Sequence, residues 1–317
     1  MSFKMVLLPP DIGEGWPDKI RQAVPGAQVE AFKDAAAARD AIVEADAAYG
    51  TVPRELLARA GKLRWIAAPR AGLGGDWFYD ELVKSPVVVT NLSGIYNDPL
   101  AHHVMGFVLA FARRFDHYLP QQKDGAWKRS ARMLDLASMT ALVVGVGGAG
   151  AEAARLCAAF GMQVSGVDPR LTTPPAGVRA IVSPEHLDEQ LARADFVILT
   201  TPETPQTVGL FNAGRFAAMK PGAYFINIGR GACVVTDDLV AALASGRLAG
   251  AGLDVVAPEP LPPGHPLWTM PGVLLTPHVA IYGAPYQPKK EALLLDNCRR
   301  FANGEPLLNV VDKANWF

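Results

Sequence analysis

Residues 141–150 read ALVVGVGGAG, and this stretch decides the fold of the chain. Its first half is an apolar run that predicts a buried strand, and its second half fits the pattern GxGxxG. Residues 151–160 predict a helix, and residues 163–168 predict a second strand. A strand, a glycine-rich turn, a helix and another strand, in this order, are typical of a parallel βαβ unit.

The glycine pattern indicates a loop that binds the pyrophosphate of a dinucleotide. Small residues let the backbone turn tightly, and the free N–H groups at the N-terminus of the following helix would point at the phosphates. The alternative is a turn whose glycines only allow close packing of the helix, and the order of the surrounding elements argues against it. The loop residues expected to contact the dinucleotide are Gly145, Gly147, Gly148, Ala149 and Gly150.

Asp168 ends the second strand, 18 residues after Gly150. An acidic side chain at this place would accept hydrogen bonds from the adenosine ribose, and its charge would repel a 2′-phosphate. Arg170, two residues further on, could instead pair with such a phosphate. The sequence therefore predicts NAD as the cofactor and leaves NADP open.

The composition argues against several classes of protein. The chain has 317 residues, of which 50% are hydrophobic, and a formal net charge of −1. This length suits two domains, and no run of Lys or Arg indicates binding to nucleic acid or to a membrane surface. The cysteines Cys157, Cys233 and Cys298 lie far apart without CxxC spacing, which argues against structural zinc and disulfides. We expect a soluble, cytoplasmic protein that needs no metal and does not associate with a membrane.

The rest of the chain alternates between strand and helix patterns. Before residue 97, the predicted strands cover residues 4–9, 29–32, 47–50, 63–68 and 87–90, and the predicted helices cover 34–45 and 53–60. After residue 168, the predicted strands cover 195–200, 223–228, 250–255 and 273–276, and the predicted helices cover 237–244 and 289–303. Alternation of this kind predicts an α/β fold with parallel sheets covered by helices on both faces.

Several helix ends carry capping signals. Asp98 is expected as the N-cap, and Pro99 as the first residue, of an apolar and buried helix that continues to about residue 114. Thr236 is expected to cap the helix that follows it, and Gly304 is expected to end the last helix.

Arg230, Glu259 and His278 each follow a predicted strand. Ligands of open parallel sheets bind at the carboxyl ends of the strands, so these side chains are candidates for chemistry. Each has an ordinary explanation when taken alone, namely a solvated loop arginine, a surface turn and a structural histidine.

The motifs around these residues carry a resemblance to a known family. NIGRG at 227–231, DVVAPEPLP at 254–262 and TPHVA at 276–280 resemble the D-isomer-specific 2-hydroxyacid dehydrogenases, in the same order and over nearly the whole chain. Within that family, the chain is most similar to glyoxylate/hydroxypyruvate reductases of the bacterial A type. That likeness is carried by RRFDHY at 113–118, WK at 127–128, DDLVAALASGRLAG at 237–250 and LPPGHPLW at 261–268.

The resemblance implies hydride transfer between a nicotinamide cofactor and a small 2-oxo or 2-hydroxy acid, with D stereospecificity. Arg230 would bind the substrate carboxylate and polarise the 2-oxo group. His278 would contact the substrate and donate a proton to the ketone oxygen. Glu259 would accept a hydrogen bond from the other ring nitrogen of His278 and favour the protonated ring.

Two other functions stay open for the same residues. Phosphite oxidation uses a similar Arg-Glu-His set, whereas a formate dehydrogenase would be expected to carry Gln in place of Glu259. A protein that senses NAD(H) without catalysis is the non-enzymatic alternative, although such a protein would not need to retain Arg230, Glu259 and His278 together.

The resemblance also implies further contacts. For the cofactor these are Thr201, Pro202, Thr207, Ile228, Gly229, Asp254 and Ala280. The substrate carboxylate would meet backbone N–H groups in the loop Ala71, Gly72, Leu73 and Gly74, flanked by Arg70 and Trp77. A plain glycine turn is the alternative for that loop.

The fold implied by the resemblance consists of two Rossmann-like, doubly wound parallel-sheet domains with a cleft between them. Residues 1–97 with 284–317 would form the substrate domain, and residues 98–283 the NAD(P)-binding domain. A homodimer is implied as well.

The chain departs from its family at three places. His102 stands where many members have an acidic residue before the histidine that His103 matches. The run 168–170 reads DPR where the A-type reductases, which favour NADP, have a Ser/Arg pattern, and this difference supports NAD. Tyr282 and Tyr286, which follow the candidate catalytic histidine, leave the shape of the substrate pocket open.

Overall fold

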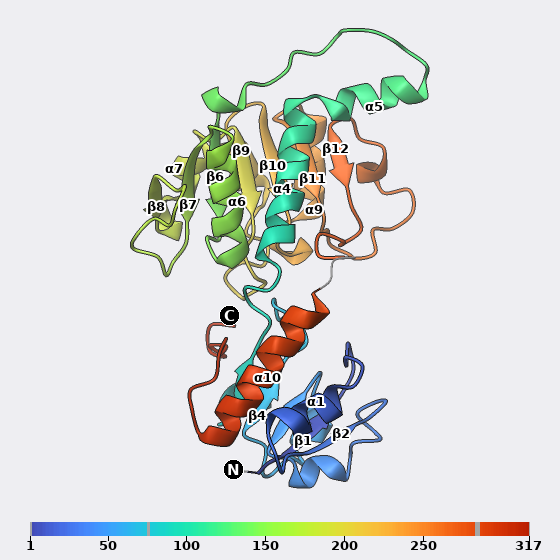
Figure 1. The fold of residues 1–317 in the computed structure, drawn as a ribbon. Helices are drawn as coiled ribbons and strands as arrows, with labels where there is room; N and C mark the ends of the chain where they lie inside the picture. Colours follow the sequence, from blue (N-terminus) through green and yellow to red (C-terminus); the bar gives the residue numbers. More distant parts are fainter. Residues whose placement is uncertain (1, 75–76, 283–285, 317) are drawn as a thin grey trace. The chain divides into compact units, whose positions relative to one another are not determined.

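The computed structural model describes residues 2–74, 77–282 and 286–316. The chain forms two compact units, Met1–Tyr96 with Ala284–Phe317, and Asn97–Gly283. Each unit is built on one parallel β-sheet with helices packed against it, as Figure 1 shows. The fold is therefore α/β with two doubly wound parallel sheets, as the alternating sequence pattern predicts.

The first unit has a five-stranded sheet in the order β2-β1-β3-β4-β5. Its strands are β1 Lys4–Leu7, β2 Gln28–Ala31, β3 Ala47–Tyr49, β4 Trp65–Ala67 and β5 Val88–Thr90, and its helices are α1 Trp16–Ala23, α2 Arg54–Leu57, α3 Asp80–Lys84 and α10 Gln287–Asn303. Met5 on β1 pairs with Val29 on one side and with Ala47 on the other. The strand order thus reverses at β1.

The predicted helix over residues 34–45 is wrong. This segment forms turns that end in the short 3-10 helix η1 Ala41–Glu44. The Asp34 carboxylate accepts a hydrogen bond of 2.8 Å from the backbone N–H of Ala37, which starts a turn in place of a helix. Local propensity for a helix gives way here because tertiary packing decides the conformation of a short segment.

The second unit has a seven-stranded sheet in the order β12-β11-β10-β9-β6-β7-β8. Its strands are β6 Thr140–Val144, β7 Gln163–Val167, β8 Ala180–Val182, β9 Phe196–Leu199, β10 Ala223–Asn227, β11 Leu248–Leu253 and β12 Val273–Leu275. Its helices are α4 Asn97–Ala112, α5 Phe115–Lys123, α6 Gly148–Ala159, α7 Leu187–Leu191, α8 Ala213–Ala218 and α9 Thr236–Ala244. The sequence predicted six of these strands and missed β8, whose side chains are half-buried or exposed at the edge of the sheet.

The topology of this second sheet places its ligand-binding edge. All paired strands are parallel, so their carboxyl ends lie along one edge. From β6 the chain continues to β7 on one side and returns to β9 on the other. Ligands of open α/β sheets bind where the strand order reverses in this way, which here is between β6 and β9.

Two hydrophobic cores sandwich the sheet. Val104, Val108 and Phe111 of α4 pack with α6 residues on one face, where Figure 1 shows these two helices side by side. Phe216 of α8 and Leu239 of α9 belong to the core on the other face. No helix of the described residues is long and apolar enough to cross a bilayer.

Two of the predicted helix starts need correction. Helix α4 begins at Asn97, so Asp98 lies inside its first turn and is not the N-cap. Thr236 is the first residue of α9, with Val235 at the cap, because the Thr236 hydroxyl donates to the carbonyl of Ala257. Gly304 does end α10, with a left-handed φ of 73°.

Candidate active site

The carboxyl edge of the seven-stranded sheet gathers the candidate residues of the second unit. They follow six strands in turn: Gly145 to Gly150 after β6, Asp168 and Arg170 after β7, Thr201, Pro202 and Thr207 after β9, Ile228, Gly229 and Arg230 after β10, Asp254 and Glu259 after β11, and His278 and Ala280 after β12. Because the strands are parallel, residues up to 135 positions apart in the chain, Gly145 and Ala280, share one edge.

The glycine loop is shaped to admit a dinucleotide. Gly145 has a φ of 93°, and a Cβ on Gly150 would lie 2.1 Å from the Gly145 carbonyl oxygen. Gly147 occupies the N-cap of α6 and, having no side chain, offers the first turn of the helix no capping group. The N–H groups of that turn can therefore meet phosphate oxygens, so these residues fit the pyrophosphate of a nicotinamide dinucleotide.

Asp168 is buried and paired with Arg170. Its carboxylate, 3% exposed as a residue, accepts hydrogen bonds from the backbone N–H groups of Val146 at 3.0 Å and Arg170 at 2.9 Å. The Arg170 guanidinium contacts both carboxylate oxygens, with Nε 3.2 Å from Oδ1 and Nη2 3.3 Å from Oδ2. The sequence predicts that the negative charge of Asp168 repels a 2′-phosphate. In the structure, the half-exposed guanidinium of Arg170 compensates this charge.

The loop that carries Arg230 is held by a residue that the sequence analysis missed. Asn227, 1% exposed at the end of β10, accepts from the Gly229 N–H at 3.0 Å and donates to the Arg230 carbonyl at 3.1 Å. A Cβ on Gly231 would lie 1.9 Å from the Val256 carbonyl oxygen, so a glycine is required where the loops after β10 and β11 touch. A buried asparagine inside the NIGRG motif was the available signal for this role.

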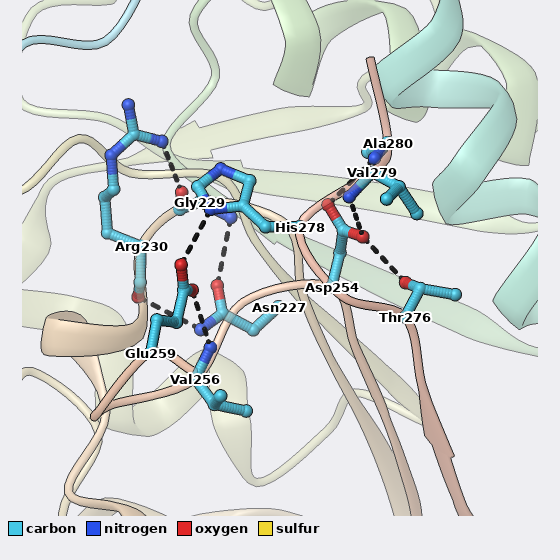
Figure 2. Close-up of polar contacts among 10 residues, drawn as sticks. All are labelled: Asn227, Gly229, Arg230, Asp254, Val256, Glu259, Thr276, His278, Val279 and Ala280. Carbon is cyan, nitrogen blue, oxygen red and sulfur yellow. Dashed lines mark hydrogen bonds and ion pairs between the residues drawn. The ribbon is translucent and has the colours of Figure 1, made fainter. Parts of the chain in front are cut away.

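His278 and Glu259 form a hydrogen-bonded pair. His278 Nδ1 lies 2.8 Å from Glu259 Oε2, and Glu259 Oε1 accepts from the Val256 N–H at 3.1 Å (Figure 2). An ionised carboxylate is an acceptor only, so Nδ1 carries the hydrogen of this bond. Figure 2 shows Arg230 and the His278 ring on the same side of these loops. The pair therefore orients the imidazole with Nε2 directed away from Glu259.

The His278 backbone adopts a strained conformation. Its φ of 54° lies in the left-handed region, which costs a residue with a side chain roughly 1–3 kcal/mol. The His278 N–H donates to the carbonyls of Asp254 at 2.8 Å and Thr276 at 3.0 Å. The Asp254 carboxylate, in a residue that is 2% exposed, accepts from the N–H groups of Val279 at 2.9 Å and Ala280 at 3.0 Å. Asp254 thus holds the loop in place.

A histidine of α4 reaches the same carboxylate. His103 Nε2 lies 2.8 Å from Thr276 Oγ1 and 3.6 Å from Asp254 Oδ1, and the Thr276 hydroxyl donates to Asp254 Oδ1 at 2.7 Å. The sequence singled out the His102–His103 pair only as a departure from the family. Nothing in the sequence pointed to a contact between His103 and Thr276, which lie 173 residues apart.

The remaining cofactor candidates are mostly buried in or near the edge of the sheet. Thr207 uses its hydroxyl within its own loop, donating to the Pro202 carbonyl at 2.7 Å and accepting from the Thr204 N–H at 2.8 Å. Thr201, Ile228 and Ala280 are buried. Within the described residues, no three His, Cys, Asp or Glu side chains gather in a way that could hold a metal ion.

The candidate substrate loop belongs to the first unit, where Ala71, Gly72 and Leu73 come after β4. The Asn91 side chain donates to the Ala71 carbonyl at 2.8 Å, and Leu73 is buried. Of the flanking residues, Arg70 is exposed, whereas Trp77 is buried and donates its backbone N–H to the Gly74 carbonyl. Tyr286 packs edge-on against Tyr96 in the same unit, and Tyr282 is exposed in the second unit.

A family model and a curated relative both match most of the second unit and point to the same family. The model of the D-isomer specific 2-hydroxyacid dehydrogenase NAD binding domain matches residues 105–280. Glyoxylate/hydroxypyruvate reductase A from Serratia proteamaculans is 33% identical in an alignment of 283 residues that covers 86% of this chain and 87% of that protein.

Solved structures agree over the full length. A D-isomer specific 2-hydroxyacid dehydrogenase from Xanthobacter autotrophicus Py2, in complex with NADPH and MES, is 33% identical, with a TM-score of 0.84 and 100% of both chains covered. An NADPH-dependent glyoxylate/hydroxypyruvate reductase from Sinorhizobium meliloti, in complex with NADP and sulfate, is 29% identical, with a TM-score of 0.83 and coverage of 99% of this chain and 100% of that one. The chain therefore belongs to the D-isomer specific 2-hydroxyacid dehydrogenase family and is an oxidoreductase that uses a nicotinamide dinucleotide.

Proposed function

We propose that this protein reduces a small 2-oxo acid to the D-2-hydroxy acid, with glyoxylate and hydroxypyruvate as the first candidates. The observation that carries the proposal is the hydrogen bond of 2.8 Å between His278 and Glu259, next to the Arg230 loop at the ligand-binding edge of the sheet. The names of the Serratia and Sinorhizobium relatives support the choice of substrates.

The proposed mechanism uses three side chains. A bound nicotinamide supplies the hydride for the 2-oxo carbon. Arg230 binds the substrate carboxylate and polarises the neighbouring carbonyl, since a planar guanidinium matches an anionic carboxylate. His278 donates the proton on Nε2 to the carbonyl oxygen, and Glu259 keeps Nδ1 protonated and the ring in one orientation. In the direction of oxidation, His278 accepts the same proton.

The Asp168–Arg170 pair bears on the choice of cofactor. The carboxylate is buried beneath a guanidinium that lies close to the glycine loop, 3.8 Å from where a Cβ of Gly147 would stand. A cation in this position would pair with a 2′-phosphate. We therefore expect both dinucleotides to bind and NADPH to bind more tightly, in line with the NADP(H) bound to the two solved relatives.

The domain roles follow from the same proposal. The unit with the seven-stranded sheet would bind the dinucleotide. The other unit carries the candidate substrate loop, Ala71, Gly72 and Leu73, which Asn91 anchors. Three buried free cysteines are consistent with work in a reducing cytoplasm.

The protein is further proposed to act as a homodimer. Helix α5 has no buried residue and extends beyond the sheet of its unit in Figure 1. Phe115, Leu119 and Trp127 are exposed there, Trp127 to 96%, around a hollow of about 640 Å³. Exposed apolar patches of this kind mark interaction surfaces, and a second copy is the expected partner. Light scattering should give twice the 33.8 kDa of the chain, and a mass of one chain for Trp127→Ser.

The reaction is tested by absorbance at 340 nm. Wild type and His278→Ala would each receive NADH or NADPH with glyoxylate, hydroxypyruvate, pyruvate or phenylpyruvate. Turnover by the wild type that falls at least about 100-fold in the variant supports the proposal. Tight binding of NADPH without turnover of any 2-oxo acid would overturn it, and reduction of NAD⁺ by phosphite would replace it with phosphite oxidation.

The cofactor preference is tested with Arg170→Ala. Loss of a charge-assisted contact to the 2′-phosphate should lower kcat/KM for NADPH by about 10-fold or more and change that for NADH by less than about threefold. Equal losses with both dinucleotides would mean that Arg170 does not discriminate between them.

A further inference from the structure

The loop that presents His278 depends on one buried carboxylate. The backbone N–H groups of Val279 and Ala280 and the hydroxyl of Thr276 all point at Asp254, whose backbone carbonyl accepts from His278 itself. Any displacement of the Asp254 carboxylate would therefore move His278, whose ring must stay aligned with Glu259.

The direction of the hydrogen bonds leading to this carboxylate can be assigned. Thr276 has one hydroxyl hydrogen, and Asp254 Oδ1 at 2.7 Å can only accept it. In the contact of 2.8 Å with His103, Thr276 Oγ1 must then be the acceptor, and His103 Nε2 must carry a hydrogen. The three residues form one chain of hydrogen bonds that runs from His103 through Thr276 to Asp254.

The position of His103 is itself fixed. Its side chain is 21% exposed, and its ring packs edge-on against Phe107, one turn further along α4, with the ring centroids 4.9 Å apart. The adjacent His102 is exposed on the same helix, and the chain of hydrogen bonds from His103 to Asp254 does not include it. The two neighbouring histidines thus have different surroundings, which makes His102 a matched control.

We propose that His103 is a positioning residue for the proposed reduction, because its hydrogen bond to Thr276 fixes the Asp254 carboxylate and thereby the loop that carries His278. Figure 2 shows the contact of Thr276 with Asp254. The inference rests on the proposed function for its kinetic consequences. The structural consequence, a loop held by His103, does not depend on which substrate is turned over.

Kinetics of full-length variants test the proposal. His103→Leu and Thr276→Val should each lower kcat about 10-fold. The kcat of the double variant should be no more than about threefold below that of the less active single variant, because both changes break the same chain of hydrogen bonds. His103→Gln keeps an N–H donor and should recover most of kcat, and His102→Leu should behave as wild type.

Two results would overturn the proposal. One is a kcat for His103→Leu that equals that of His102→Leu, and the other is a double variant in which the two losses multiply. If His103→Leu does not fold, the kcat values of Thr276→Val and Thr276→Ser are compared instead, because only Ser keeps the hydroxyl. Equal kcat values for those two variants would also refute it.

Hydrogen exchange separates this proposal from the proposed function. Residues 273–282 should exchange their amide hydrogens faster in His103→Leu and Thr276→Val than in wild type or His102→Leu. This readout needs no turnover, so a wild type without reductase activity overturns the proposed function alone. Unchanged exchange in both variants overturns the role of His103.

Discussion

Glu259 has two hydrogen-bonding duties, one for each carboxylate oxygen. Oε2 accepts from His278, and Oε1 accepts from the Val256 N–H of its own loop. A carboxylate can serve both donors at once, whereas an amide has only one oxygen acceptor. The identity of this residue therefore decides both the orientation of the imidazole and the shape of the loop beneath it.

For Glu259→Gln we expect kcat to fall about 10- to 100-fold, because the proton donor loses its orienting carboxylate. The Kd for NADPH should stay within about threefold, since Glu259 lies after β11 and away from the glycine loop. Steady-state kinetics and fluorescence titration measure the two quantities. Glu305→Gln, on the exposed surface, is the control, and an unchanged kcat in Glu259→Gln would contradict the assignment.

The three cysteines allow a second prediction about single side chains. Burial raises the pKa of both Cys157 and Cys298 to about 12, and burial also raises the pKa of Cys233. Only the thiolate attacks a disulfide reagent, so at pH 8 the native protein should react slowly with DTNB. In urea all three thiols should react within minutes. Fast reaction of the native protein would show that these residues become exposed.

Among the secondary-structure elements, β6 and β9 are tied together at their amino ends by Asp195. Its carboxylate accepts from the N–H and the hydroxyl of Thr140, both at 2.9 Å, and pairs with Lys220 at 2.5 Å. Burial raises the pKa of this carboxyl, but the contacts with Lys220 and Thr140 outweigh burial and lower it overall. The pair therefore stabilises the two strands that flank the dinucleotide crevice.

The pH dependence of Asp195→Asn follows from that direction. A carboxyl whose folded pKa is lowered contributes stability above its unfolded pKa, about 3.9, and loses it as the pH falls through the folded pKa. At pH 7 the free energy of unfolding of the variant should be about 1–2 kcal/mol smaller than that of wild type. This difference should shrink as the pH falls below about pH 4.

Chemical denaturation across this pH range measures that difference. Asp188→Asn is the control, because Asp188 forms an exposed ion pair with Arg215 at 3.4 Å and should change stability by less than about 1 kcal/mol. A constant difference between pH 3 and pH 7 would contradict an ionised Asp195 as the source of the stability.

Considered as a whole, the molecule has two units with separate cores, and the proposed dinucleotide site belongs to one of them. A ligand that binds only the folded state adds about 2.7 kcal/mol of stability at 100 times its Kd. We expect NADPH to raise the melting temperature of the unit formed by Asn97–Gly283, as measured by scanning calorimetry.

A substitution in the glycine loop controls for non-specific stabilisation. In Gly150→Val the added side chain would meet the Gly145 carbonyl and the Thr200 hydroxyl, so the loop could not keep its shape. The rise in melting temperature with NADPH should then disappear. A rise of equal size in this variant would place the dinucleotide elsewhere.

Much of this organisation could be predicted from the order of residues. The alternation of apolar strands and helices predicts the parallel α/β fold, and the GxGxxG pattern in its strand–helix setting indicates a dinucleotide loop. The fold places Arg230, Glu259 and His278 at one edge because parallel strands bring their carboxyl ends together. Errors arose where a local pattern was weak, as in the Ala-rich segment 34–45 and the edge strand β8.

Local sequence patterns thus settle most of the strands and the longer helices, and which ends of the strands carry polar residues, because periodicity and turn signals act over a few neighbouring positions. Only the tertiary structure decides the pairings between distant side chains. The contact of His103 with Thr276 and the contact of Asp195 with Thr140 join residues that lie 173 and 55 positions apart, and both depend on side-chain direction and burial. Those properties exist only once the sheet has brought its strands together, since a hydrogen bond requires its two atoms within about 3.5 Å of each other.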